Sequence, residues 1–172
     1  MEQEVPADAS SLIYLAKADS FDLAGHVARP ILVPPSVWRE AVVAGQEVGA
    51  PEVPRILVAE REGLLQRVEL AEAELRLAGT IATQHRLGSS ESEVLAITPI
   101  GARAILDEGR ATRVARSRGV VPISTVFLSV VGFAAGDLDA EQARELLRRI
   151  ASVVGIRTDV LLALERQLRR TT

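Results

Sequence analysis

Short apolar runs alternate with longer amphipathic segments along this chain. Runs bounded by Pro or Gly are typical of buried strands, whereas apolar residues roughly three to four positions apart are typical of helices. The pattern predicts strands at 5–8, 31–33, 64–68, 102–106 and 120–123, with a last edge strand at 153–154.

Helices are predicted where Ser, Asp or Pro opens a periodic apolar segment and Gly or Pro closes it. Their ranges are 10–16, 35–45, 56–62, 71–78, 90–97, 110–118, 125–135, 139–150 and 159–170. Residues 46–54 are predicted to form a loop, and residues 80–88 an irregular insertion. Strands that alternate with helices indicate an α/β fold in which helices cover both faces of a parallel sheet.

The size and composition fit one globular domain. The chain has 172 residues, of which 48% are hydrophobic and 25% charged, so we expect a single domain over 1–172 with a helical segment from about residue 139. Because cysteine is absent, disulfides, thiolate metal sites and a cysteine nucleophile are excluded. The net charge of −3 argues against a general nucleic-acid coat. Trp38, the only tryptophan, is expected in the core or an interface rather than as a platform for stacking bases.

Two features of the chain concern membranes and targeting. No stretch of about 18 apolar residues is present, so we expect no transmembrane helix and no membrane partner. The acidic residues 1–4 lack the basic region of a signal peptide. We therefore expect a cytoplasmic protein.

Four acidic residues each adjoin an apolar segment: Asp8, Glu40, Glu93 and Asp107. A lone carboxylate is costly to bury, and a divalent cation is a common partner for it. Asp8 and Asp107 each follow a predicted strand, so both reach one crevice if their strands are neighbours where the strand order reverses. A cation there would relieve the repulsion between them. If all four acids converge, the chain is a metal-dependent hydrolase or nuclease; if not, it is an α/β domain with scattered acids.

Each acid also has a simpler role open to it. Asp8 can cap the helix that follows it, and Glu40 can pair with Arg39 on a solvated helix face. Asp107 can start the turn from its strand into the next helix. Ser90 and Glu93 fit a capping box at the start of a helix. Two neighbouring acids are alternatives: Glu91 to Glu93, and Glu108 to Asp107.

Several hydroxyl and guanidinium groups are candidates for contacts with a substrate. Ser10 is expected to cap a helix and to bond a carboxylate. Ser124 and Thr125 follow the strand at 120–123 and either position a water or phosphate or cap the next helix. Arg110 and Arg113 lie one turn apart and either hold a phosphate group of a substrate or form a solvated face.

The chain resembles the PIN-domain family in four blocks, which keep their order and spacing from about residue 4 to residue 165. The first has an Asp, a small-residue turn and an apolar helix, and the second a Pro-Pro entry to an acid-bearing helix. The third is another acid-bearing helix, and the fourth an apolar strand followed by Asp-Glu and an Arg-bearing helix. The blocks are residues 8–17, 31–40, 91–96 and 105–115.

This resemblance implies a three-layer α/β/α fold with a parallel sheet of about five strands. It implies a Mg²⁺- or Mn²⁺-dependent endoribonuclease whose metal is surrounded by Asp8, Glu40, Glu93 and Asp107. Many small bacterial members are toxins of toxin–antitoxin pairs, so the partners implied are RNA, a small antitoxin protein and a second copy in a homodimer. The alternative is a non-catalytic PIN-like module that binds RNA or another protein. A phospho-acceptor receiver domain is disfavoured because no lysine follows the strand at 120–123.

Overall fold

The strands lie where the apolar runs predict them, although each is short. In this computed structural model, residues 4–107 and 109–168 are described. The strands are β1 (Val5–Pro6), β2 (Ile31–Val33), β3 (Leu65–Arg67), β4 (Arg103–Ile105) and β5 (Val121–Ile123). All the strand pairings are parallel.

The strands form two small sheets that adjoin each other. One has the order β1-β2-β3 and the other is the pair β4-β5. An isolated parallel bridge between Ala7 and Ile105 joins them, and the Asp8 amide donates to the Ile105 carbonyl at 3.1 Å. We call this junction the β1–β4 seam. The strand order across it is β3-β2-β1-β4-β5, so the order reverses between β1 and β4, as expected for a site of this fold class.

Pro6 explains why the strands do not form one continuous ladder. The amides of Val5 and Ala7 donate toward β2, to Pro30 and Leu32, whereas the Asp8 amide donates toward β4. Successive residues of a strand face opposite neighbours, so position 6 faces β4, and proline has no N–H to donate. The expected sheet of about five strands is therefore divided into three strands and two.

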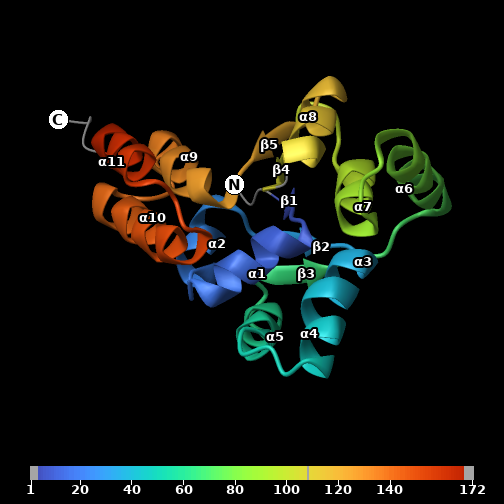
Figure 1. The fold of residues 1–172 in the computed structure, drawn as a ribbon, viewed down its shortest axis with the longest axis horizontal. Coiled ribbons are helices and arrows are strands. Elements are labelled where there is room, and N and C mark those ends of the chain that lie inside the picture. The colour runs from blue at the N-terminus through green and yellow to red at the C-terminus, as the bar shows by residue number, and fades with distance from the viewer. Residues whose placement is uncertain (1–3, 108, 169–172) are drawn as a thin grey trace.

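Helices lie on both sides of the strands, as Figure 1 shows with α9, α10 and α11 to the left and α6 and α7 to the right. The N-terminal helical elements are α1 (Ala9–Lys17), α2 (Phe21–Val27), α3 (Pro35–Trp38), the π-helical turn η1 (Arg39–Val43), α4 (Ala44–Glu47) and α5 (Val53–Arg61). The later ones are α6 (Glu72–His85), α7 (Ser89–Ile97), α8 (Gly109–Ser117), the 3₁₀ turn η2 (Thr125–Phe127), α9 (Leu128–Ala135), α10 (Ala140–Val154) and α11 (Thr158–Gln167). The mixed α/β fold with parallel strands is confirmed.

Two local predictions are wrong, and one helix was missed. Residues 80–85 continue α6 instead of forming an insertion, because Ile81 is buried beyond Gly79 and a glycine inside a helix costs only about 1 kcal/mol. Residues 153–154 end α10 instead of forming a strand, and Gly155 stops that helix at a φ of 70°. The helix α2 was not predicted at all. The predicted end of the last helix, 169–170, lies outside the described residues.

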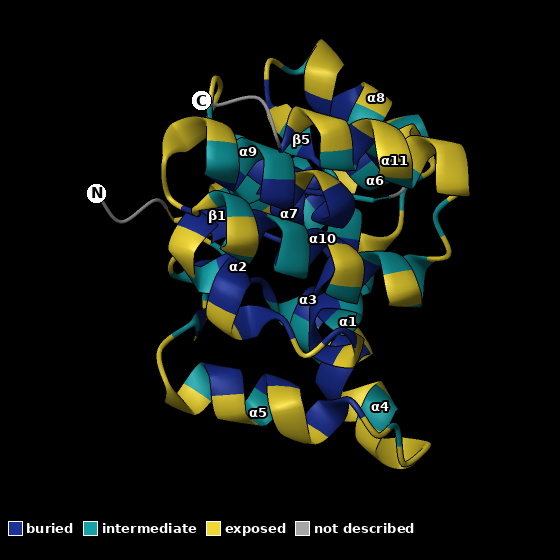
Figure 2. Ribbon diagram, turned by 90° about the vertical axis from the view of Figure 1, so that its left-hand side faces the viewer, coloured by how far each residue is buried: buried dark blue, intermediate teal, exposed yellow. Residues whose placement is uncertain are grey.

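The core consists of Leu, Ile, Val and Ala, with Phe21, from the strands and from the inner sides of the helices. Figure 2 shows buried residues where the helices face one another and exposed residues on their outer sides. Asp139 caps α10 by accepting from the amides of Glu141 and Gln142, both at 2.8 Å, as its position before an apolar segment predicts. Among the described helices, none is both long enough and apolar enough to cross a membrane.

Candidate functional site

Asp8 stands at the carboxyl end of β1 and opens α1. Its Oδ1 accepts hydrogen bonds from the Ser11 amide at 2.8 Å and from the Ser10 hydroxyl at 3.2 Å. The predicted capping role of Asp8 and the predicted bond from Ser10 to a carboxylate are therefore both confirmed. The prediction that Ser10 caps the helix is wrong, because Asp8 is the N-cap and Ser10 is the second residue of α1. Capping occupies only one of the two carboxylate oxygens.

The second oxygen, Oδ2 of Asp8, is buried and has no hydrogen-bond partner among the described residues. The whole residue is 1% exposed. Burial raises the pKa of Asp8 from 3.8 to about 6; hydrogen bonds from Ser11 oppose the rise, and the charge of Asp107 adds to it. An ionised Asp8 thus lacks a positive partner among its described neighbours.

Asp107 stands at the carboxyl end of β4, beside Asp8. Its Oδ2 accepts from the Ser11 hydroxyl at 2.9 Å and from the Thr125 hydroxyl, and its Oδ1 accepts from the Thr125 amide at 2.9 Å. Ser11 therefore contacts Asp8 through its amide and Asp107 through its hydroxyl. The prediction that these two strand ends meet where the strand order reverses is confirmed.

Glu40 and Glu93 are held by a reciprocal pair of serine contacts. The carboxylate of Glu93, on α7, accepts from the amide and the hydroxyl of Ser36 on α3, at 2.7 and 2.5 Å. In return, Ser90 on α7 donates to Glu40 in η1 at 3.0 Å. We call these contacts the serine–glutamate clamp. It joins the second and third acid-bearing segments, 57 and 50 residues apart in the chain.

The capping box predicted for α7 is wrong. Gly88 is the N-cap, the helix begins at Ser89, and no side chain caps it. The Glu93 carboxylate reaches Ser36 instead of its own helix end, because α7 packs against α3. Glu91, the alternative acid, lies back over Gly88, where a Cβ would meet its Oε2 at 2.5 Å.

The four acids form two pairs instead of one cluster. Within residues 4–107 and 109–168, no group of three or more His, Cys, Asp or Glu side chains is placed to hold a metal ion. The Asp8–Asp107 pair nevertheless fits Mg²⁺ or Mn²⁺ in its chemistry, because carboxylate and hydroxyl oxygens are hard donors and Mg²⁺ uses few protein carboxylates. The unpartnered Oδ2 of Asp8 is the observation that favours a cation.

The remaining candidates lie around the same edge of the sheet. Thr125, rather than Ser124, contacts Asp107; Ser124 is the N-cap of η2 and makes no side-chain capping bond. Arg110 and Arg113 are exposed on α8, and the Arg110 guanidinium donates to the Arg86 carbonyl at 3.0 Å. Glu108, the alternative to Asp107, lies outside the described residues.

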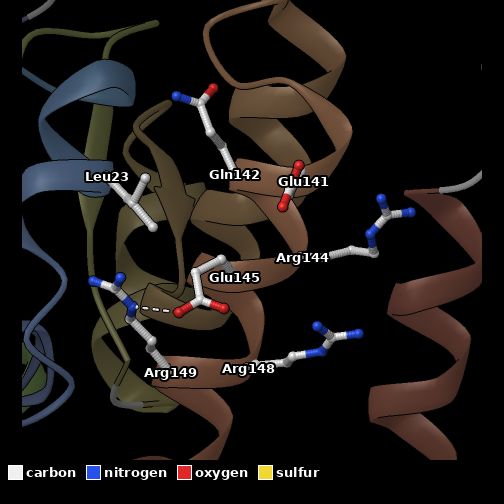
Figure 3. A pocket seen from close by; sticks show the side chains of 7 residues that line it. All are labelled: Leu23, Glu141, Gln142, Arg144, Glu145, Arg148 and Arg149. Atoms are coloured by element: carbon white, nitrogen blue, oxygen red, sulfur yellow. Dashed lines mark hydrogen bonds and ion pairs between the residues drawn. The ribbon is translucent and has the colours of Figure 1, made fainter.

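A cavity of about 700 Å³ lies away from these acids, between α2 and α10. Figure 3 shows its lining, including Arg149 and Glu145, which form an ion pair at 2.8 Å. Arg148, which also lines the cavity, pairs with Glu165 at 3.5 Å. Because none of the predicted site residues lines this cavity, its volume does not make it the functional site.

Comparison with known proteins identifies a family. The profile of a family described as the PIN domain matches residues 5–166. No curated protein and no solved structure shows significant similarity to the chain. The match includes all four predicted acids and every strand, and PIN domains have a nuclease-type fold that typically uses divalent metals. The chain therefore belongs to the PIN-domain family.

Proposed function

We propose that this protein is a metal-dependent endoribonuclease that hydrolyses RNA phosphodiester bonds with Mg²⁺ or Mn²⁺. The observation that carries the proposal is the buried Oδ2 of Asp8, which has no described partner and lies beside a second carboxylate at the sheet edge. A structural acid would be expected to have both oxygens satisfied. Membership of a family of nuclease-type fold supports the same conclusion.

Asp8 and Asp107 would hold the cation. Ser11 and Thr125 fix the orientation of Asp107 and leave Asp8 Oδ2 free. A divalent cation, when bound, supplies Lewis-acid activation of water and offsets charge on a phosphodiester. In this proposal Glu40 and Glu93 complete the acid set from the serine–glutamate clamp on the neighbouring strand end.

RNA would be positioned by groups around this edge. Ser10 lies next to Asp8, and Ser124 precedes the Asp107 partner Thr125. Arg110 and Arg113 are exposed on the helix that follows Asp107 and suit bidentate contacts with phosphate.

The test is cleavage of a mixed RNA substrate by wild type, Asp8→Asn and Asp107→Asn in Mg²⁺, Mn²⁺ or EDTA. Asp137→Asn is the matched control, because Asp137 is an exposed aspartate after α9 and is not among the site residues. We expect metal-dependent cleavage that both site variants reduce at least about 100-fold and that the control retains. Equal cleavage by all four proteins would indicate a contaminant and contradict the proposal.

The second candidate function is a non-catalytic module that binds RNA or another protein. The separation of the acids into two pairs favours it, since no described group of three or more is placed to hold a metal ion. This candidate predicts a well-folded wild type that cleaves nothing in either metal at any concentration tested.

We further propose the biological role of a toxin held inactive by a small antitoxin protein, with a homodimer as its assembly. Support comes from the family resemblance of the four acid-bearing blocks. Expression of wild type alone should arrest growth, Asp8→Asn should not, and co-expression of a small neighbouring gene product should restore growth. Arrest by Asp8→Asn equal to that of wild type would contradict a role for cleavage in toxicity.

A further inference from the structure

A cavity of about 370 Å³ lies at the carboxyl ends of β2 and β3, next to the acid-bearing segments. Trp38, Arg39 and Val43 line it from α3 and η1, and Arg67 and Glu69 line it from the end of β3. Its volume falls in the range of about 300–1,000 Å³ typical of sites for small ligands and ligand groups. We call it the Trp38 pocket.

The pocket contains a preformed stack. The Arg67 guanidinium carbon lies 4.6 Å from the centroid of the Trp38 ring. Trp38 is half-buried, so the expectation that it packs on the core is confirmed for part of the ring, and the rest lines the cavity. Unpaired nucleic-acid bases stack on aromatic rings and on guanidinium planes, and this pocket presents one of each.

The charges of the pocket suit a nucleotide. Arg39 and Arg67 are both exposed, and among the residues that the structure describes neither forms an ion pair with a carboxylate. Of the described residues in the lining, Glu69 is the acidic one. Two guanidinium groups beside an aromatic ring can contact phosphate while the base occupies the ring.

The Trp38 pocket and the proposed metal site lie on the same edge of the sheet. Strands β1, β2 and β3 are neighbours in one parallel sheet, so their carboxyl ends share that edge. At about 4.8 Å between strands, the end of β3 is about 10 Å from Asp8 at the end of β1. Arg39 of the pocket directly precedes Glu40 of the clamp in the chain. A strand of RNA at Asp8 and Asp107 would therefore pass the pocket with a neighbouring nucleotide.

We propose that the Trp38 pocket binds the base of a single-stranded RNA nucleotide next to the cleavage site. The inference rests on the proposed ribonuclease function and names the subsite that its substrate would occupy. The base replaces Arg67 over the Trp38 ring, because base–aromatic stacking is the stronger of the two contacts, and the freed guanidinium turns to a phosphate. Duplex RNA is excluded because its bases are already stacked and paired.

The test uses Trp38 fluorescence, which is specific because the chain has one tryptophan. Full-length protein in EDTA is titrated with a short single-stranded RNA, with the same RNA as a duplex, and with a free nucleoside monophosphate. We expect saturable quenching by the single strand and little by the duplex. EDTA prevents metal-dependent cleavage, so the reading does not depend on activity.

Labelled single-stranded RNA then gives affinities by fluorescence anisotropy. We expect about 5- to 100-fold weaker binding by Trp38→Leu, from the typical value of one stacked base, and weaker binding by Arg67→Gln. Arg67 is exposed at a strand end, so its variant keeps the proposal testable even if Trp38→Leu loses core packing. Arg61→Gln, exposed on α5 and outside the pocket lining, is the matched control and should bind as wild type does.

The outcomes separate this proposal from the ribonuclease proposal. The pocket proposal is overturned if both pocket variants bind RNA as tightly as wild type does, if no RNA binds, or if duplex RNA quenches equally. This holds even if Asp8→Asn abolishes cleavage. Quenching by the free nucleotide but not by RNA would also overturn it and would indicate a small-molecule site. Quenching by the single strand with loss of affinity in both variants would support the pocket even if wild type cleaves nothing.

Discussion

At the scale of single residues, Asp8 is an acid that folding places in an unfavourable environment. It combines burial, a neighbouring acid and an unpartnered oxygen, and the hydrogen bonds from Ser10 and Ser11 only partly offset these effects. A pKa of about 6 means that the folded protein binds the Asp8 proton more tightly than the unfolded chain does. The ionised carboxylate therefore opposes folding unless a cation accompanies it.

The first prediction is that, without metal, the Asp8 contribution to the free energy of unfolding falls as pH rises. It is fully present below pH 3.8, where both states are protonated, and it is lost as pH rises through about 6. A shift from 3.8 to about 6 corresponds to about 3 kcal/mol. Asp8→Asn should remove this slope and be the more stable protein at about pH 8. Urea unfolding in EDTA across this pH range measures the slope with pH and the difference in stability at about pH 8.

Metal addition supplies the complementary measurement. Mn²⁺ should stabilise wild type at about pH 8 in proportion to its occupancy and leave Asp8→Asn nearly unchanged. Asp137→Asn should behave as wild type does in both experiments. The same pH slope in Asp8→Asn and wild type would assign the slope to other groups and contradict the prediction.

At the scale of elements, the serine–glutamate clamp ties α3 and η1 to α7. Ser36 and Ser90 are both buried, so their hydroxyls gain by donating to the carboxylates that reach them. Glu40 lies in a π-helical turn, a helical irregularity often found at functional sites. The clamp thus holds two predicted metal-site acids in a defined position without a metal.

The second prediction concerns this clamp. Ser36→Ala should lower the free energy of unfolding by about 1–2 kcal/mol, since it removes a hydroxyl that bonds a partly exposed carboxylate. Ser90→Ala should cost less, because Glu40 is exposed and can bond water instead. A double-mutant cycle between Ser36→Ala and Glu93→Ala, by urea unfolding, isolates the pair. Additive effects in that cycle would show that the contact is absent in solution.

The third prediction uses two helical glycines in contrasting surroundings. At Gly132 on α9, a Cβ would lie 2.5 Å from Val27 and 2.9 Å from Leu138, so Gly132→Ala should cost about 1–3 kcal/mol. At Gly79 on α6 nothing lies within 4 Å, so Gly79→Ala should stabilise the protein by about 1 kcal/mol. Urea unfolding of each variant and of wild type would measure both changes in the free energy of unfolding. A neutral Gly132→Ala would show that α9 can move away from α2.

At the scale of the whole molecule, the features that the sequence could predict are those encoded locally. Apolar runs gave the strand positions, and acids that directly follow them gave Asp8 and Asp107, because parallel strand ends share an edge. The clamp could not be predicted, since it depends on how α7 packs against α3 across more than fifty residues of chain. The stack of Arg67 on Trp38 has the same origin, because it joins the end of β3 to the helix α3.

Local signals were also misleading where packing decides the outcome. Gly79 looked like a helix end, yet Ile81 is buried beyond it and helps to anchor the rest of α6. In α2, Gly25 is a poor helix former, but it lets the helix approach Leu64, where a Cβ would lie 2.9 Å away. In both cases a tertiary contact overrides the local preference of glycine.

The β1–β4 seam has a mechanical consequence. Pro6 leaves the two halves of the sheet joined by little backbone hydrogen bonding, and Asp8 and Asp107 project from opposite halves. A cation held by both carboxylates would connect the two sheets across the β1–β4 seam. Binding of the cation would then make the two sheets more rigid relative to each other. The Asp8 amide, which donates across the seam to Ile105, would exchange its hydrogen more slowly when the cation is bound.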